Sequence, residues 1–158
     1  MKIRGSIDYS ILEKAINIFI EKNDSIRIRI NTASDEPRQY VHEYQYMKID
    51  YFDFSSSGLD AVYAWDKQQS RTPFNLVDSD LFYFAMIKIN DNEGALYIKT
   101  HHLVSDAWTM SLIASQIMEY YSALVKGLEI EEGKKPSYLE FVEKESNYMN
   151  SRKYIKDR

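Results

Sequence analysis

Residues 81–108 read LFYFAMIKINDNEGALYIKTHHLVSDAW and contain the clearest structural signals of the chain. Leu81 to Asn90 and Ala95 to His101 are rich in apolar, β-branched and aromatic residues, which is typical of buried strands. The stretch between them, Asn90-Asp91-Asn92-Glu93-Gly94, has the composition of a hairpin connection. We therefore expect two paired strands, the second of which ends at a pair of histidines.

A long helix is expected after this hairpin, roughly from Asp106 to Lys126, with Gly127 as a plausible stop. Apolar side chains recur along it at steps of three and four residues, so one stripe of the helix should be buried. The stripe consists of Ile113, Ile117, Tyr120, Tyr121 and Leu124.

The segments before the hairpin show both helical and strand periodicity. Asp8 or Ser10 can cap a helix whose apolar residues follow at four-residue steps. Between Ser25 and Thr32, isoleucine alternates with polar residues, as in a half-buried strand. Further strands are expected at 3–6, 39–44 and 47–52, and further helices at 59–70 and 138–148. Helices mixed with largely antiparallel strands indicate an α+β fold, a mixed sheet with helices packed on it.

Composition narrows the function classes. The 158 residues, 44% of them hydrophobic, suffice for a single domain over 1–158. No apolar run approaches the roughly 20 residues of a membrane span, and the polar N-terminus carries no signal core. The absence of cysteine excludes thiolate metal sites and suits a cytoplasmic location. A net charge of −4 without a concentrated basic surface makes nucleic acid a poor candidate partner.

The two histidines, His101 and His102, stand between the predicted strand and helix. Adjacent residues on a strand point to opposite faces, so one imidazole should point inward and the other toward any cleft. Because the chain's only other histidine is His42, a multi-histidine metal site has little support. A neutral imidazole at such a strand end can take up a proton near pH 7. Asp106 could orient a histidine or pair with a buried arginine, and a purely structural histidine pair is an open alternative.

Residues 101–108, HHLVSDAW, resemble the HHxxxDG signature of condensation domains of nonribosomal peptide synthetases, which also occurs across the chloramphenicol-acetyltransferase-like superfamily. Other segments resemble the same family in order and spacing. Residues 5–8 and the following helix look like its first core strand and helix, and 23–30 resemble "RHExLRTxF", with Asn23 in place of the histidine. Residues 72–82 resemble "xPFDLxxxPLxR", and 137–141 resemble "psYxdf".

The resemblance implies one acetyltransferase-like lobe of a V-shaped pair with a tunnel between the lobes. Carrier proteins would deliver donor and acceptor thioesters on phosphopantetheine, and the acceptor amine would attack the donor to give an amide. The expected partners are the C-terminal lobe, both carrier proteins and an adenylation domain, with no cofactor bound directly. Neither the family's opening segment nor its C-terminal lobe is matched, so the chain looks like an isolated N-terminal lobe. Such a lobe should be inactive alone and expose an apolar face that could drive self-association.

The resemblance also implies roles for single residues. His102 would position the attacking amine, with optional proton transfer, and His101 would point inward to support the loop. Asp106 would pair with Arg27 on the neighbouring strand, because a buried charge needs such a partner. Trp108 is expected to pack the helix against the sheet.

One departure from the signature concerns its glycine, which is Ala107 here. Alanine keeps the backbone N–H that would stabilise an oxyanion. Its methyl group would be strained if the backbone required a positive φ.

Several other functions compete with amide formation. An epimerisation domain shares the double histidine, whereas a heterocyclisation domain replaces the histidines with an aspartate-based motif that this chain does not match. A stand-alone coenzyme A-dependent acyltransferase would carry its histidine late in the chain and work as a trimer. A non-catalytic recruitment lobe would tend to lose the second histidine, which is retained here as His102.

Overall fold

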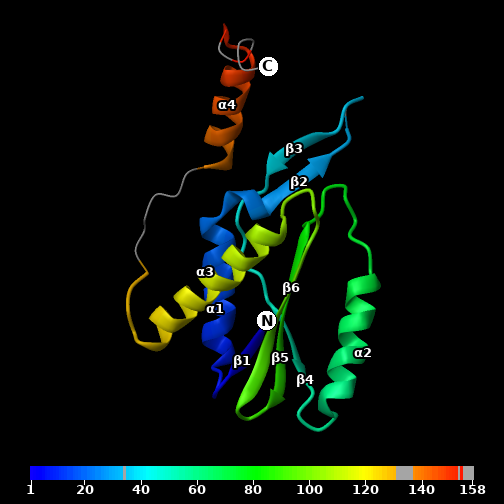
Figure 1. Ribbon diagram of the computed structural model, residues 1–158, viewed down its shortest axis with the longest axis vertical. Coiled ribbons are helices and arrows are strands. Elements are labelled where there is room, and N and C mark those ends of the chain that lie inside the picture. Colours follow the sequence, from blue (N-terminus) through cyan, green and yellow to red (C-terminus); the bar gives the residue numbers. More distant parts are fainter. Residues whose placement is uncertain (34, 131–136, 153, 155–158) are drawn as a thin grey trace.

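The structure is a computed structural model that describes residues 1–33, 35–130, 137–152 and 154. Figure 1 shows a central sheet with helices on both of its faces. The sheet has the order β1-β6-β5-β4, formed by β1 (Lys2–Arg4), β4 (Asp50–Asp53), β5 (Phe82–Asn90) and β6 (Glu93–Thr100). β6 runs antiparallel to β1 and β5, whereas β4 runs parallel to β5. The expected α+β fold with a mixed, largely antiparallel sheet is confirmed.

The hairpin of β5 and β6 forms where the sequence predicts it. Its register shifts between Lys88 and Asn90, next to the turn, and Gly94 lies opposite Lys88. A Cβ at Gly94 would stand 2.6 Å from the side chains of Ile7 and Tyr9. Glycine is needed here because the chain leading into the first helix passes directly over the strand.

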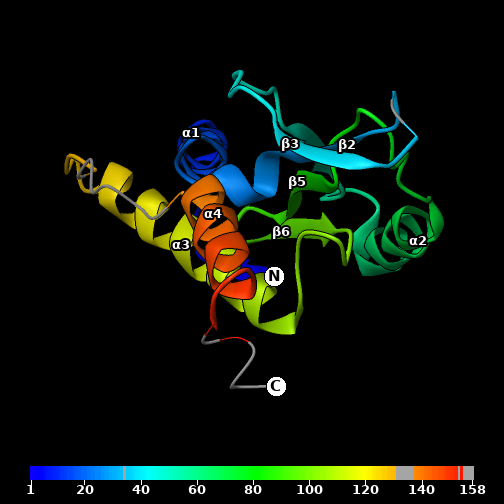
Figure 2. The same ribbon diagram turned by 90° about the horizontal axis from the view of Figure 1, so that it is seen from above.

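Two helices, α1 (Tyr9–Lys22) and α3 (Ala107–Val125), pack against each other on one face of the sheet, and α2 (Gly58–Arg71) covers the opposite face (Figure 2). Of the two predicted caps, Asp8 and Ser10, it is Asp8 that caps α1, accepting from the backbone N–H groups of Ser10 and Ile11. The core between the helices and the sheet includes Leu12, Ile16, Ile20, Phe84, Met86, Leu96, Ile113 and Ile117. Within the described ranges, no helix is both long and apolar enough to cross a membrane.

A second, two-stranded sheet joins β2 (Ile28–Asn31) and β3 (Arg38–Val41). The strand expected from Ser25 begins later, because the 3₁₀ turn η1 (Asp24–Arg27) first redirects the chain after α1. The last helix, α4 (Tyr138–Met149), is attached to η1. Its N-terminal Ser137 hydroxyl and Tyr138 N–H both donate to the carboxylate of Asp24 at 2.8 Å.

The strand predicted at 47–52 is shorter in the structure, because side chains of α1 form hydrogen bonds with the backbone of its first residues. Asn17 accepts from the Met47 N–H at 2.8 Å and donates to the Met47 carbonyl at 2.9 Å. Glu13 accepts from the Ile49 N–H, and its carboxylate also binds Tyr46 and Lys48. Both α1 side chains are buried. The backbone of this segment therefore bonds to side chains of a helix, and strand pairing begins only at Asp50.

The Glu13 cluster should make stability depend on pH. Burial by itself raises the pKa of Glu13, but hydrogen bonds from Tyr46, Lys48 and the Ile49 N–H outweigh it, so the pKa lies below its usual 4.5. A carboxyl whose pKa is lowered by folding stabilises the fold above its unfolded pKa and loses that contribution as the pH falls through the folded value. Glu13→Gln should therefore lower Tm at pH 7, and the difference from the wild type should shrink below a pH of about 4.5.

Thermal melts of both proteins between pH 7 and pH 3 measure this difference. Glu21→Gln, on an exposed position of the same helix, is the matched control and should leave Tm nearly unchanged at every pH. A Tm deficit of Glu13→Gln that stays constant over the whole range would contradict the assignment.

Candidate active site

The histidine pair lies in the short loop that connects the end of β6 to the start of α3 (Figure 1). The His101 N–H still donates to the Leu81 carbonyl at 2.8 Å, which holds the loop against the residue that precedes β5. Beyond this bond the chain turns, and α3 begins at Ala107. The loop is thus fixed at both ends by regular structure.

His101 is half-buried. Its Nδ1 accepts from the Leu103 N–H at 3.1 Å, and its ring meets Phe74 edge-on with 6.1 Å between centroids. The Lys99 ammonium lies 4.6 Å above the Phe74 ring and donates to the carbonyl of Thr72. The segment around Phe74, which resembles a second family motif, therefore packs beside the histidine signature.

His102 is exposed, and the loop orients its imidazole. The Nδ1 atom lies 3.1 Å from the carbonyl oxygen of Ser105. A carbonyl oxygen only accepts hydrogen bonds, so Nδ1 must carry the hydrogen. In the neutral ring Nε2 then holds a lone pair and can accept a proton.

The predicted ion pair between Asp106 and Arg27 is wrong. Asp106 caps α3, accepting at 2.7 Å from both the backbone N–H and the hydroxyl of Thr109. These bonds hold the pKa of the Asp106 carboxyl below its usual value. Arg27 instead donates to three backbone carbonyls, those of Ile20, Glu21 and His42.

The physical reason lies at the end of α1. The last carbonyls of a helix have no partner within the helix, and a nearby arginine can satisfy them. Arg27 follows α1 directly through η1, so its guanidinium reaches the Ile20 and Glu21 carbonyls. Asp106 is exposed and satisfied by its own helix, so it needs no distant cation.

A double-mutant comparison can test this correction. Arg27→Ala should lower the free energy of unfolding by about 2 kcal/mol, because three backbone carbonyls, two of them in partly buried contacts, lose charge-assisted hydrogen bonds. Asp106→Ala should lower Tm by removing a helix cap. Since the two side chains do not interact, the double variant should show the sum of the two Tm changes. Thermal unfolding of the wild type, the two single variants and the double variant measures this. A double variant no less stable than Arg27→Ala alone would show that Asp106 and Arg27 do form an ion pair.

Two further predictions concern the first turn of α3. Trp108 does not pack the helix against the sheet: it is 73% exposed, because it lies on the side of α3 opposite the buried Ile113 and Ile117. Leu112, one turn later, shares its face, and both are exposed apolar residues close to the loop. Ala107 is the first residue of α3 and has no positive φ, so its methyl group causes no backbone strain.

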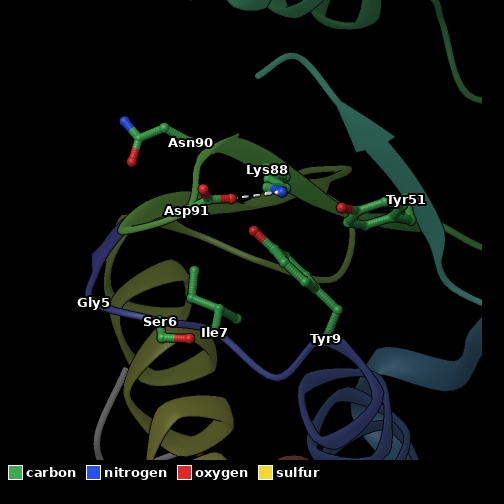
Figure 3. Close-up of a pocket in the computed structure, with 8 residues that line it drawn as sticks. All are labelled: Gly5, Ser6, Ile7, Tyr9, Tyr51, Lys88, Asn90 and Asp91. Carbon is green, nitrogen blue, oxygen red and sulfur yellow. Dashed lines mark ion pairs between the residues drawn. The ribbon is translucent and has the colours of Figure 1, made fainter. Parts of the chain in front are cut away.

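A cavity of about 300 Å³ lies at the opposite end of the hairpin (Figure 3). Tyr9 and Tyr51 line it together with Lys88, whose ammonium pairs with Asp91 at 2.9 Å. Asp53 lies 3.9 Å from the same ammonium. Because two carboxylates neutralise its one cation, the cavity has no free positive charge for an anionic ligand. Across the described part of the chain, no three His, Cys, Asp or Glu side chains gather as a metal site.

Comparisons with known proteins agree with the geometry. A family model described as "Condensation domain" matches residues 1–158. One plipastatin synthase subunit of Bacillus subtilis (strain 168) is 34% identical over 100% of this chain and 6% of its own length. Surfactin synthase subunit 1 of the same organism is 33% identical over 97% of this chain and 4% of its own length. The chain therefore spans a small part of these relatives.

A solved structure shows the same fold. The crystal structure of the starter condensation domain of rhizomide synthetase RzmA superposes with a TM-score of 0.90 at 26% sequence identity. The match covers 99% of this chain and 38% of that chain.

Proposed function

Because the chain belongs to the condensation-domain family, we propose that it supplies the histidine-bearing lobe of an enzyme that forms amide bonds in nonribosomal peptide synthesis. The observation that carries the proposal is the position of His102. His102 is exposed at the end of the central sheet. Its Nδ1 donates to the Ser105 carbonyl, so the lone pair that can accept a proton is on Nε2. An epimerisation domain would give a different product, which the assay below detects. A stand-alone acyltransferase would instead turn over coenzyme A thioesters, and a recruitment lobe would be indifferent to the loss of His102.

In the proposed reaction, the amine of the acceptor attacks the carbonyl carbon of the donor thioester. A nitrogen–carbon bond forms and the carbon–sulfur bond breaks, so the donor's phosphopantetheine arm leaves as a thiol. His102 Nε2 positions the amine, takes up its proton and passes it to the departing sulfur. His101 supports the loop from its half-buried position.

The first turn of α3 can serve the same reaction. The N–H of Ala107 belongs to the first helical residue, and such N–H groups have no partner within a helix. The Asp106 carboxylate accepts from the N–H of Thr109, which lies two residues after Ala107. We assign the Ala107 N–H as a donor to the oxyanion that develops on the donor carbonyl, at the positive end of the α3 dipole.

The proposed assembly needs partners. The chain matches 38% of the length of a solved condensation domain, which supports its assignment as one of two lobes. The exposed Trp108 and Leu112 beside the loop are suited to face a second lobe. Donor and acceptor carrier proteins would bring the substrates, and an adenylation domain would load them. A cytoplasmic location stays a prediction.

The test is an amide-formation assay with loaded donor and acceptor carrier proteins, followed by mass spectrometry of the product. The complete two-lobed domain should form the amide, whereas the chain of residues 1–158 should form none, because a single lobe cannot enclose the reacting groups. Turnover by the single chain would contradict the two-lobe assignment. An inverted donor stereocentre without amide formation would favour the epimerisation function.

A further inference from the structure

The loop that carries the histidines is closed by two hydroxyl groups. The Oγ1 of Thr100, the last residue of β6, lies 2.5 Å from the Oγ of Ser105, just before α3. Ser105 Oγ is also 3.3 Å from the His101 carbonyl, and Thr100 Oγ1 is 3.2 Å from the sulfur of Met110. Both hydroxyl-bearing residues are half-buried.

Two hydroxyl hydrogens must serve these three contacts, and acceptor strength decides how. A carbonyl oxygen is a much better acceptor than a thioether. Ser105 therefore donates to the His101 carbonyl, and Thr100 donates to Ser105. The resulting chain of hydrogen bonds ties the end of the strand to the start of the helix across the histidines.

The same loop distinguishes the two imidazoles. The Nδ1 of His101 accepts from the Leu103 N–H, so in the neutral ring its hydrogen is on Nε2. The Nδ1 of His102 donates to the Ser105 carbonyl, so its hydrogen is on Nδ1. Adjacent histidines thus have opposite tautomers, and the bond to Ser105 sets the tautomer of His102.

We propose that Thr100 and Ser105 are positioning residues for His102. Their hydroxyl chain fixes the Ser105 carbonyl against His102 Nδ1, and this contact keeps the Nε2 lone pair available. The consequence for the reaction rests on the proposed function: the other tautomer would present an N–H to the acceptor amine, which could not accept its proton. The tautomers themselves are a property of the chain and do not depend on that function.

Nuclear magnetic resonance of the ¹⁵N-labelled chain tests the proposal, because the chain has only three histidines to assign. At a pH of about 8.5, where an ordinary histidine is neutral, His101 should carry its hydrogen on Nε2 and His102 on Nδ1. Ser105→Ala and Thr100→Val should each shift His102 toward the Nε2–H form and leave His101 largely unchanged. Ser105→Thr, which keeps the hydroxyl, should retain the wild-type ratio. Ser122→Ala, on an exposed position of α3, is the matched control.

The outcomes separate this proposal from the proposed function. A wild-type His102 with its hydrogen on Nε2, or an unchanged tautomer ratio in both hydroxyl-free variants, would overturn the positioning role. In the two-lobed domain, the same variants should lower kcat about fivefold at unchanged KM, the effect of about one hydrogen bond, and Ser105→Thr should restore it. Absence of amide formation in every protein, with the tautomers as predicted, would count against the proposed function alone.

Discussion

Replacing His102 by alanine in the complete two-lobed domain should lower the rate of amide formation by about 10²- to 10⁴-fold, the usual contribution of a positioned acid–base group. The His102 imidazole is exposed, and its Nδ1 bond to Ser105 leaves Nε2 to accept the proton of the amine. Removing it takes away both the positioning of the amine and the proton acceptor. Single-turnover assays with loaded carrier proteins measure the effect.

The matched control is His42→Ala, which removes the third histidine of the chain. His42 bonds to Arg27 only through its backbone: its carbonyl accepts from the Arg27 side chain, and its N–H donates to the Arg27 carbonyl. Both backbone groups survive the substitution. This variant should retain wild-type turnover. If His102→Ala stayed within about twofold of the wild type, the histidine would be structural and the function would have to be assigned elsewhere.

The second large effect is expected in the core. Ile117 is fully buried in α3, where that helix packs against α1. Ile117→Ala should lower the free energy of unfolding of the chain by about 2–5 kcal/mol, because the methyl groups leave a cavity that rigid neighbours fill only in part. Urea unfolding monitored by the near-ultraviolet signal of the two tryptophans gives this value.

Leu112→Ala offers a control on the same helix. Leu112 is 45% exposed, so its truncation should change the stability of the isolated chain by no more than about 0.5 kcal/mol. Equal losses in the two variants would mean that α3 packs through a different face.

The predictable part of the fold comes from local patterns. The β5–β6 hairpin, the Asp8 cap of α1 and the buried stripe with Ile113 and Ile117 follow from residues that are close in sequence. Periodicity determines which face of an element can be buried, whatever its distant contacts are. The position of the histidine pair between a strand and a helix also follows from such patterns. The function inferred for that position, amide formation, comes from the resemblance of residues 101–108 to the condensation-domain signature.

The errors lie where distant groups compete for the same partner. The resemblance implies a carboxylate partner for Arg27, Asp106, but the guanidinium instead donates to the carbonyls at the end of α1. Trp108 is expected to pack α3 against the sheet, yet it lies on the exposed side of that helix. Glu13 and Asn17 shorten a predicted strand by bonding to backbone groups 30 or more residues away.

By itself, the sequence determined the α+β class, the order of most elements and the loop that holds His101 and His102, because these depend on local periodicity and composition. Only the tertiary structure decided which groups bond within that loop. The tautomer of His102 depends on a carbonyl three residues along, and the place of that carbonyl depends on two hydroxyls brought together by the end of β6 and the start of α3. Hydrogen bonds require atoms at defined distances and angles, and a sequence pattern fixes neither.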